Sequence, residues 1–214
     1  MEPVVTRHPD IDPIAALLEL ASTSPRLVGI EGLNYVTQLD RVAVRSGLSV
    51  PSAPSLEEIA AFRGADRSRA ERPADAAECC PLPGLSDLGP VAQLRETLCA
   101  ALFDEEGSPN CGPAVYIAGE RLTRAALEYG LLPALTRDGR LTVDSARADV
   151  AGRLASRLVP AAMSLVADGL MPRLRTCSDV WCRAPFLDRT RNGCAQFCSR
   201  TCAARVRKRR QRAA

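Results

Sequence analysis

The sequence predicts a mainly α-helical protein with small β-hairpins, in which a helical N-terminal domain over residues 1–170 precedes a compact cysteine-rich module over residues 171–214. Apolar residues recur at helical spacing through the first part, and each part contains one turn dipeptide that predicts a hairpin, Asp138-Gly139 and Asn192-Gly193. Five of the nine cysteines fall between Cys177 and Cys202. The first part is long enough to bury a core, whereas the module is not.

Helix-start signals define the first predicted elements. Asp12 before Pro13 predicts the start of a helix, and a capping box at residues 55–58 opens a second helix that reaches Phe62. Residues 63–89 combine many charges with Pro and Gly, so they predict a loop or insertion.

The pattern after residue 89 predicts helix, helix, hairpin and helix. Residues 122–131 predict another short helix, and the stretch PALTRDGRLTVD places Asp138-Gly139 between two strands. Asp144 is the predicted N-cap of a long helix that runs to Leu170 and is bent or interrupted at Pro160. The preceding helix begins at Pro90 and carries a buried stripe of Val91, Leu94, Leu98 and Leu102.

The cysteine spacing predicts a metal site. Cys177 and Cys182 enclose four residues, Cys198 and Cys202 enclose three, and fifteen residues separate the two pairs. Two closely spaced pairs suit a tetrahedral thiolate site, for which Zn²⁺ is the usual metal. Cys194 is left over, although it could replace Cys198 in the ligand set. Ordinary buried thiols and an iron–sulfur cluster are the alternatives.

The residues around these cysteines predict a treble-clef-like zinc finger. Apolar residues 184–187 and 195–197 flank Asn192-Gly193, which predicts a short hairpin between the cysteine pairs. Residues 199–212 lack Gly and Pro and predict a helix. Because so small a module has little core, metal binding would supply on the order of 10 kcal/mol of its folding free energy.

The segment LRTCSDVWCRAPFLDRTRNGCAQFCSRTCAARVRKRR resembles the CGNR zinc finger, found at the C-terminus of bacterial proteins described as stress-response transcription regulators. The resemblance lies in residues 173–177, in residues 186–192 and in the last cysteine pair with the basic residues after it. The sequence departs from the family at residues 202–205, which read Cys-Ala-Ala-Arg, at Phe197 and at Cys194. The order of elements upstream resembles the ABATE domain. The resemblance implies a DNA-binding transcription regulator with a structural zinc ion.

The net charge changes sign near the boundary between the helical domain and the cysteine-rich module. Residues 173–214 hold twelve Lys or Arg and two Asp, a net charge of +10, whereas residues 1–172 carry −7. This asymmetry predicts a polyanion as partner. The sequence places no aromatic platform beside the basic run, which argues against a dedicated single-strand or RNA reader. The candidate DNA-binding residues are Arg189, Arg191, Arg205, Arg207, Lys208, Arg209, Arg210 and Arg212.

Other classes of function receive less support. No nucleotide loop, nucleophile elbow or His–Glu metal helix is present, so we expect no enzyme activity. The start of the chain does not read as a secretory signal, which predicts a cytoplasmic protein without a membrane partner. The alternative function is a zinc-dependent protein-interaction module without direct DNA binding, and redox sensing through Cys194 is a third. An effector and a homo-oligomer are left open.

Overall fold

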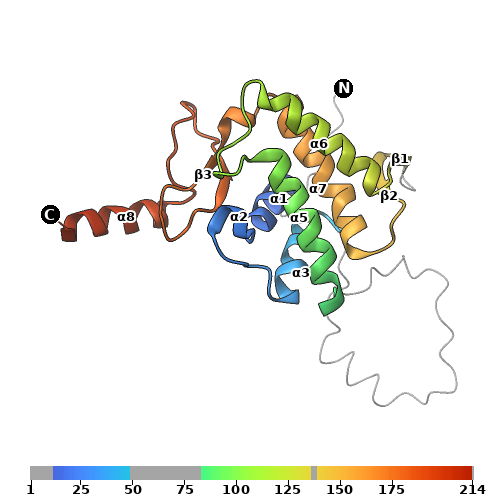
Figure 1. The fold of residues 1–214 in the computed structure, drawn as a ribbon, viewed down its shortest axis with the longest axis horizontal. Helices are drawn as coiled ribbons and strands as arrows, with labels where there is room; N and C mark the ends of the chain where they lie inside the picture. The colour runs from blue at the N-terminus through green and yellow to red at the C-terminus, as the bar shows by residue number, and fades with distance from the viewer. Residues whose placement is uncertain (1–11, 49–82, 136–138, 214) are drawn as a thin grey trace, which may run out of the picture.

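A computed structural model describes residues 12–48, 83–135 and 139–213, and it confirms the predicted mainly helical fold (Figure 1). The predicted helix over 55–62, most of the predicted loop over 63–89, His8 and the Cys79-Cys80 pair lie outside these residues. The helices are α1 (Pro13–Ala21), α2 (Pro25–Val28), α3 (Val36–Arg45), η1 (Leu85–Asp87), α5 (Leu88–Leu102), α6 (Ala114–Glu128), α7 (Val150–Ala167), η2 (Met171–Arg173) and α8 (Arg200–Ala213).

In the described part of the chain, two small antiparallel sheets accompany the helices. Strand β1 (Leu131–Leu135) pairs with β2 (Leu141–Ser145), and β3 (Leu174–Thr176) pairs with β4 (Pro185–Leu187). The first pair confirms the predicted hairpin, with Leu131 opposite Ser145 and Leu135 opposite Leu141. The hairpin's Asp138 lies outside the described residues, and Gly139 beside it has a φ of +77°, as a tight turn requires.

Helix α7 is the centre of the helical body. It packs against α1, α5, α6 and β2, and eleven of its residues are buried. Its length and mean hydropathy of 1.2 would also suit a membrane span, but 61% of it is buried inside the protein, as in a core helix. The helix continues through Pro160, so the predicted interruption there is absent. This helix therefore organises the core that the sequence predicted.

Three helix boundaries differ from their predictions. Helix α7 is capped by Asp149, whose side chain accepts a hydrogen bond of 2.7 Å from the amide of Gly152, whereas Asp144 lies in β2. Helix α6 begins at Ala114, eight residues before the predicted start, because the apolar side chains of Tyr116 and Ile117 are exposed and obscure the buried stripe in its first half. Helix α5 begins at Leu88 rather than at Pro90. The start of α1 at Pro13, with Asp12 as its N-cap, is as predicted.

A buried arginine connects the loops on one side of the body to α5. The Arg95 side chain is only 2% exposed and makes two hydrogen bonds of 2.6 and 2.7 Å to the carboxylate of Glu31. It also donates to Glu96 at 2.8 Å and to the carbonyl oxygen of Thr23 at 3.1 Å. Such a bidentate, charge-assisted arrangement holds the chain after α1 against α5.

We expect Arg95→Met to destabilise the body by about 1–3 kcal/mol, because it removes charge-assisted hydrogen bonds to two carboxylates that are partly exposed to solvent. Urea denaturation followed by circular dichroism would measure the change. The matched control is Arg41→Met, since Arg41 forms a 3.6 Å surface ion pair with Glu19 and should contribute less than about 0.5 kcal/mol. Equal effects of the two substitutions would contradict the importance of the buried pair.

The same ion pair should give the stability a dependence on pH. The hydrogen bonds from Arg95 lower the pKa of Glu31 below its ordinary value of 4.5. A lowered pKa in the folded state stabilises the protein above the unfolded value, and this contribution is lost as the pH falls through the folded value. The difference in stability between the wild type and Glu31→Gln should therefore be complete above pH 4.5 and disappear in stronger acid.

Candidate metal centre

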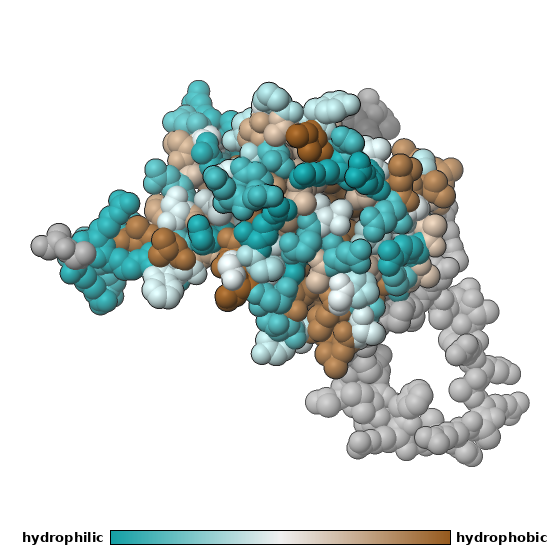
Figure 2. Space-filling model, in the orientation of Figure 1, coloured by the Kyte–Doolittle hydropathy of each residue, from teal (hydrophilic) through white to brown (hydrophobic). Residues whose placement is uncertain are grey.

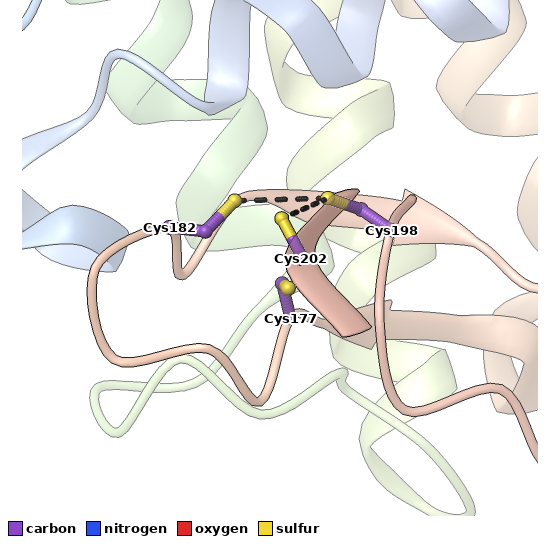
Figure 3. Close-up of side chains that lie close together, drawn as sticks. All are labelled: Cys177, Cys182, Cys198 and Cys202. Atoms are coloured by element: carbon purple, nitrogen blue, oxygen red, sulfur yellow. Dashed lines mark hydrogen bonds between the residues drawn. The ribbon is translucent and has the colours of Figure 1, made fainter. Parts of the chain in front are cut away.

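Four cysteine sulfurs face one another in the C-terminal module (Figure 3). The Sγ atoms of Cys177, Cys182, Cys198 and Cys202 all lie within 4.8 Å of one another. Cys182 and Cys198 are 3.6 Å apart, and Cys198 and Cys202 are 3.7 Å apart. Zn–S bonds of about 2.3 Å in a tetrahedron place the sulfurs about 3.8 Å apart. The four cysteines therefore fit a Zn²⁺ ion, as the sequence predicted.

Local backbone structure positions each sulfur. Cys177 follows β3, and its amide donates to the carbonyl of Ala184 at 3.0 Å. The amides of Cys182 and Arg183 both donate to the carbonyl of Asp179, at 2.8 and 3.0 Å, which closes a tight turn around the first pair. Arg183 completes this turn with a φ of +46°. Cys198 precedes α8 and Cys202 lies in its first turn, so the helix start carries the second pair.

The acid–base properties of these thiols reflect their burial and their closeness to one another. Burial raises the pKa of Cys182 and of Cys198. The pKa of Cys202 is lowered to about 7, chiefly by a hydrogen bond with Ser199 and also by one from Arg205. Four thiolates so close together would repel one another, and a divalent cation removes this repulsion when it binds. The donor set thus suits zinc through four thiolates.

The loop between the cysteine pairs differs from its prediction. Strand β4 pairs with β3, which precedes Cys177, and not with residues 195–197, so the predicted hairpin between the pairs is wrong. The reason is the buried carboxylate of Asp188, which accepts hydrogen bonds from the amides of Thr190 and Ala195 at 2.9 and 2.7 Å. These bonds fold the chain back after β4 without a second strand. The Asn192-Gly193 turn is present, with a φ of +61° at the glycine.

Two arginines outside the predicted binding set hold this turn in place. Arg173 donates to the carbonyl of Thr190 at 2.6 Å, and Arg175 donates to that of Gly193 at 2.7 Å. Their positive charges count toward the +10 of the module, yet the contacts are structural. The charge sum of the sequence therefore overstates the number of arginines available to a partner.

The module packs directly onto the helical body. Met171 and Leu174 are buried in the same apolar cluster as the core of the body. Thr176 donates from Oγ1 to the carbonyl of Gly107 at 2.8 Å, and Arg189 forms a 2.9 Å ion pair with Asp12. The module consequently has a fixed orientation on the side of the body formed by α1 and the loop at Gly107.

A buried carboxylate connects the metal site to α8. Asp179 is fully buried, and it forms ion pairs with Arg205, at 2.6 Å, and with Arg209. Burial alone would raise the pKa of Asp179, but hydrogen bonds from Arg209 and the amide of Trp181, with the charge of Arg205, hold it below the ordinary value. Arg205 also donates to the sulfur of Cys202 at 3.2 Å. Asp179 therefore fixes α8 against the turn between Cys177 and Cys182.

The structure separates the predicted DNA-binding residues into two groups. Arg205 and Arg209 are held by Asp179, and Arg189 is paired with Asp12, so these three side chains have partners within the protein. The predicted stripe of residues 205, 208, 209 and 212 thus has two of its members turned toward the module. The remaining candidates, Arg191, Arg207, Lys208, Arg210 and Arg212, are all exposed.

One exposed aromatic residue was missed by the sequence analysis. Trp181, the single tryptophan of the chain, is 76% exposed in the turn between the first two cysteines, and Val180 beside it is 73% exposed. The amide of Trp181 donates to the same oxygen of Asp179 that receives Arg209 of α8. The basic helix therefore has an aromatic neighbour in space although none adjoins it in the sequence. An apolar pair inside a four-residue cysteine turn was the available signal.

The fold and the four sulfurs define a zinc-binding module of the treble-clef-like kind at the C-terminus. Residues 173–214 match the CGNR zinc finger family, which confirms the resemblance seen in the sequence for this segment. The match covers 42 of the 214 residues, and the similarity of the helical body to the ABATE domain stays a prediction. A comparison with curated proteins finds no match to the chain.

Replacing any one of the four clustered cysteines by serine should release the zinc and unfold residues 173–214, because metal binding supplies on the order of 10 kcal/mol to so small a module. Elemental analysis of the purified variants would measure zinc per chain, and circular dichroism the loss of structure. The helical body should keep its cooperative transition, since most of its core comes from α1, α5, α6 and α7.

Cys194→Ser is the matched control for this series. Cys194 is exposed and lies outside the sulfur cluster, so the variant should retain one zinc ion per chain. Loss of zinc from the Cys194 variant together with its retention by the Cys198 variant would exclude the ligand set.

Asp179→Asn should loosen α8 while leaving the zinc bound, because it removes the negative charge that Arg205 and Arg209 share. We expect amide hydrogen exchange in residues 203–212 to accelerate by at least about tenfold. Arg207→Ala, a change on the exposed side of the same helix, should leave this exchange within about twofold of the wild type. Unchanged exchange in the Asp179 variant would rule out the anchoring role.

Proposed function

We propose that the C-terminal zinc finger binds duplex DNA through α8 and that the protein is a transcription regulator. The observation that carries this proposal is the placement of the basic side chains on α8. Arg207, Lys208, Arg210 and Arg212 are all exposed, while Arg205 and Arg209 hold the helix to a buried carboxylate.

The direction of α8 supports this assignment. The helix extends away from the helical body, and the C-terminus lies at its free end (Figure 1). The body has the opposite net charge, −7 over residues 1–172, and would itself repel a polyanion. Because the helix points away from this acidic surface, its cations are available to phosphates on several sides. A helix of 14 residues is about 21 Å long and fits a major groove.

Anchoring distinguishes α8 from a basic tail that is merely solvated. A free tail would lose conformational entropy on binding, whereas a helix already held by Asp179 and Arg205 presents its charges in a fixed arrangement. The metal ion supports the arrangement, because Cys202 of the same helix is one of its four ligands. In this proposal the zinc has a structural role, and the protein is a binding protein and not an enzyme.

Salt-dependent DNA binding tests the proposal. If about five of the exposed cations contact phosphates, log affinity for a duplex should fall with log salt with a slope near −4 to −5. Changing Arg207, Lys208, Arg210 and Arg212 together to Ala should reduce the magnitude of the slope by about 3 to 4 units. Fluorescence anisotropy of a labelled duplex, measured between about 50 and 200 mM salt, would give both slopes.

The matched control replaces the three arginines of this set by lysine. Because lysine keeps the positive charge, this variant should retain the slope of the wild type even if it loses preference for particular bases. Wild-type protein that binds no duplex in a salt-dependent way would exclude DNA as the partner.

A second candidate function, a protein-interaction module, is favoured by a different observation. A cleft of about 540 Å³ lies between the turn at Val180–Arg183 and the body, with Ile30 and Trp181 at its edge. Ile30 is 72% exposed and Trp181 is 76% exposed, so two large apolar side chains of this cleft are open to solvent. Trp181 fluorescence separates the two candidates. A protein partner in the cleft should change its emission and be weakened by Trp181→Ala, while the α8 variant binds that partner normally.

A further inference from the structure

The outer face of α6 carries apolar residues that no other element in the described part of the chain covers. Tyr116 is 80% exposed and Leu127 is 77% exposed. They are eleven residues apart, which is three helical turns, so both lie on the same face of the helix. Between them the surface is hollowed. A depression of about 520 Å³ is lined by Tyr116, Gly119, Glu120, Thr123, Arg124 and Leu127.

Gly119 leaves room at the centre of this face. A Cβ atom placed there would meet nothing within 4 Å, so the glycine is not required by packing inside the chain. Glycine destabilises a helix more than any other residue except proline. A glycine on an exposed face therefore does not stabilise the single chain. A small residue there does allow the backbone of another helix to approach closely.

The residues along this face have a self-complementary order. If a second α6 lies antiparallel on the first, with a twofold axis near residue 122, Tyr116 of each copy meets Leu127 of the other. Glu120 then faces Arg124, and these two side chains already form a 3.2 Å ion pair within the chain. Charge and apolar residues thus match under one rotation, as an isologous interface requires.

The hairpin extends the apolar surface at the C-terminal end of α6. Leu132, Leu135 and Leu141 are all more than 60% exposed. Figure 2 shows hydrophobic atoms over the hairpin and the adjoining end of α6, next to a largely hydrophilic surface. In the antiparallel arrangement this end lies beside the start of the partner's α6. The exposed apolar surface of the hairpin in one copy therefore continues into the start of α6 in the other copy.

We propose that the protein forms a twofold-symmetric dimer through the outer face of α6, with the two copies of Gly119 inside the interface on either side of the axis. The dimer contains two zinc fingers, each with its own α8, and the face lies on the body and not on the finger. Dimerisation is thus independent of metal binding and of DNA binding.

Sedimentation equilibrium of the full chain, over roughly 1–100 μM and without DNA, tests the proposal. The wild type should show a reversible equilibrium between the chain and twice its mass. Gly119→Arg should weaken this dimer by at least about tenfold, because the side chain separates the helices. It should also raise the melting temperature of the monomer or leave it unchanged, since arginine favours a helix more than glycine does. A weakened dimer therefore cannot be attributed to unfolding.

Gly89→Arg is the matched control, because Gly89 is an exposed helical glycine of α5 with nothing within 4 Å of a built Cβ atom. It should dimerise like the wild type. A wild type that is monomeric throughout, or equal weakening by both glycine substitutions, would overturn the proposal.

Charge reversal tests the antiparallel register. Glu120→Arg places two cations opposite each other, and Arg124→Glu places two carboxylates together, so each should weaken the dimer at least about tenfold. The double variant restores opposite charges across the axis and should return to within about threefold of the wild type. Dimers insensitive to either single change, or a double variant weaker than both, would exclude this register.

Discussion

The close approach of four thiolates is the constraint on which the C-terminal fifth of the chain depends. Sulfurs within 4.8 Å of one another cannot all be ionised without a cation between them. The ion joins a turn at residues 177–182 to the start of a helix twenty residues later. Few apolar side chains in this module are buried. Two that are, Met171 and Leu174, belong to the apolar core of the body. Metal binding therefore replaces the core that the module lacks.

Asp179 extends the influence of the metal site to the basic helix. Its carboxylate lies within the turn that positions the first cysteine pair, and it binds two arginines of α8. Neutralised in this way, the carboxylate is buried without an uncompensated charge. The orientation of α8 is thus set by the same few residues that hold the zinc. The exposed cations then occupy defined positions on a helix directed away from the acidic body.

The body and the finger have different physical origins of stability. The body is held by the packing of α7 against α1, α5 and α6, and by the buried arginine that binds Glu31 and Glu96. The finger is held by a metal and by side-chain contacts to carbonyls. A body with its own core can carry an interface of its own, and the exposed face of α6 lies on that part. Assembly and ligand binding can then be placed on separate surfaces of one chain.

The sequence alone determined those parts of the structure that depend on interactions between residues close together in the chain. The ligand cysteines followed from two short spacings, α1 from Asp12 and Pro13, and α8 from an uninterrupted run of helix formers, because caps, turns and i to i+4 contacts involve few residues. The division of the chain into an acidic body and a basic C-terminal module also follows from the sequence alone. Tertiary structure decided the contacts between segments that lie apart in the sequence. The sequence predicted residues 195–197 as the partner of β4, whereas the buried carboxylate of Asp188 folds the chain back after β4, which pairs with β3. The predicted N-cap Asp144 pairs within β2 in the folded chain, and Asp149, which the sequence analysis did not single out, caps α7 instead. The roles of Arg205 and Arg209 depended on a carboxylate some thirty residues away, and only the folded chain brings it within reach.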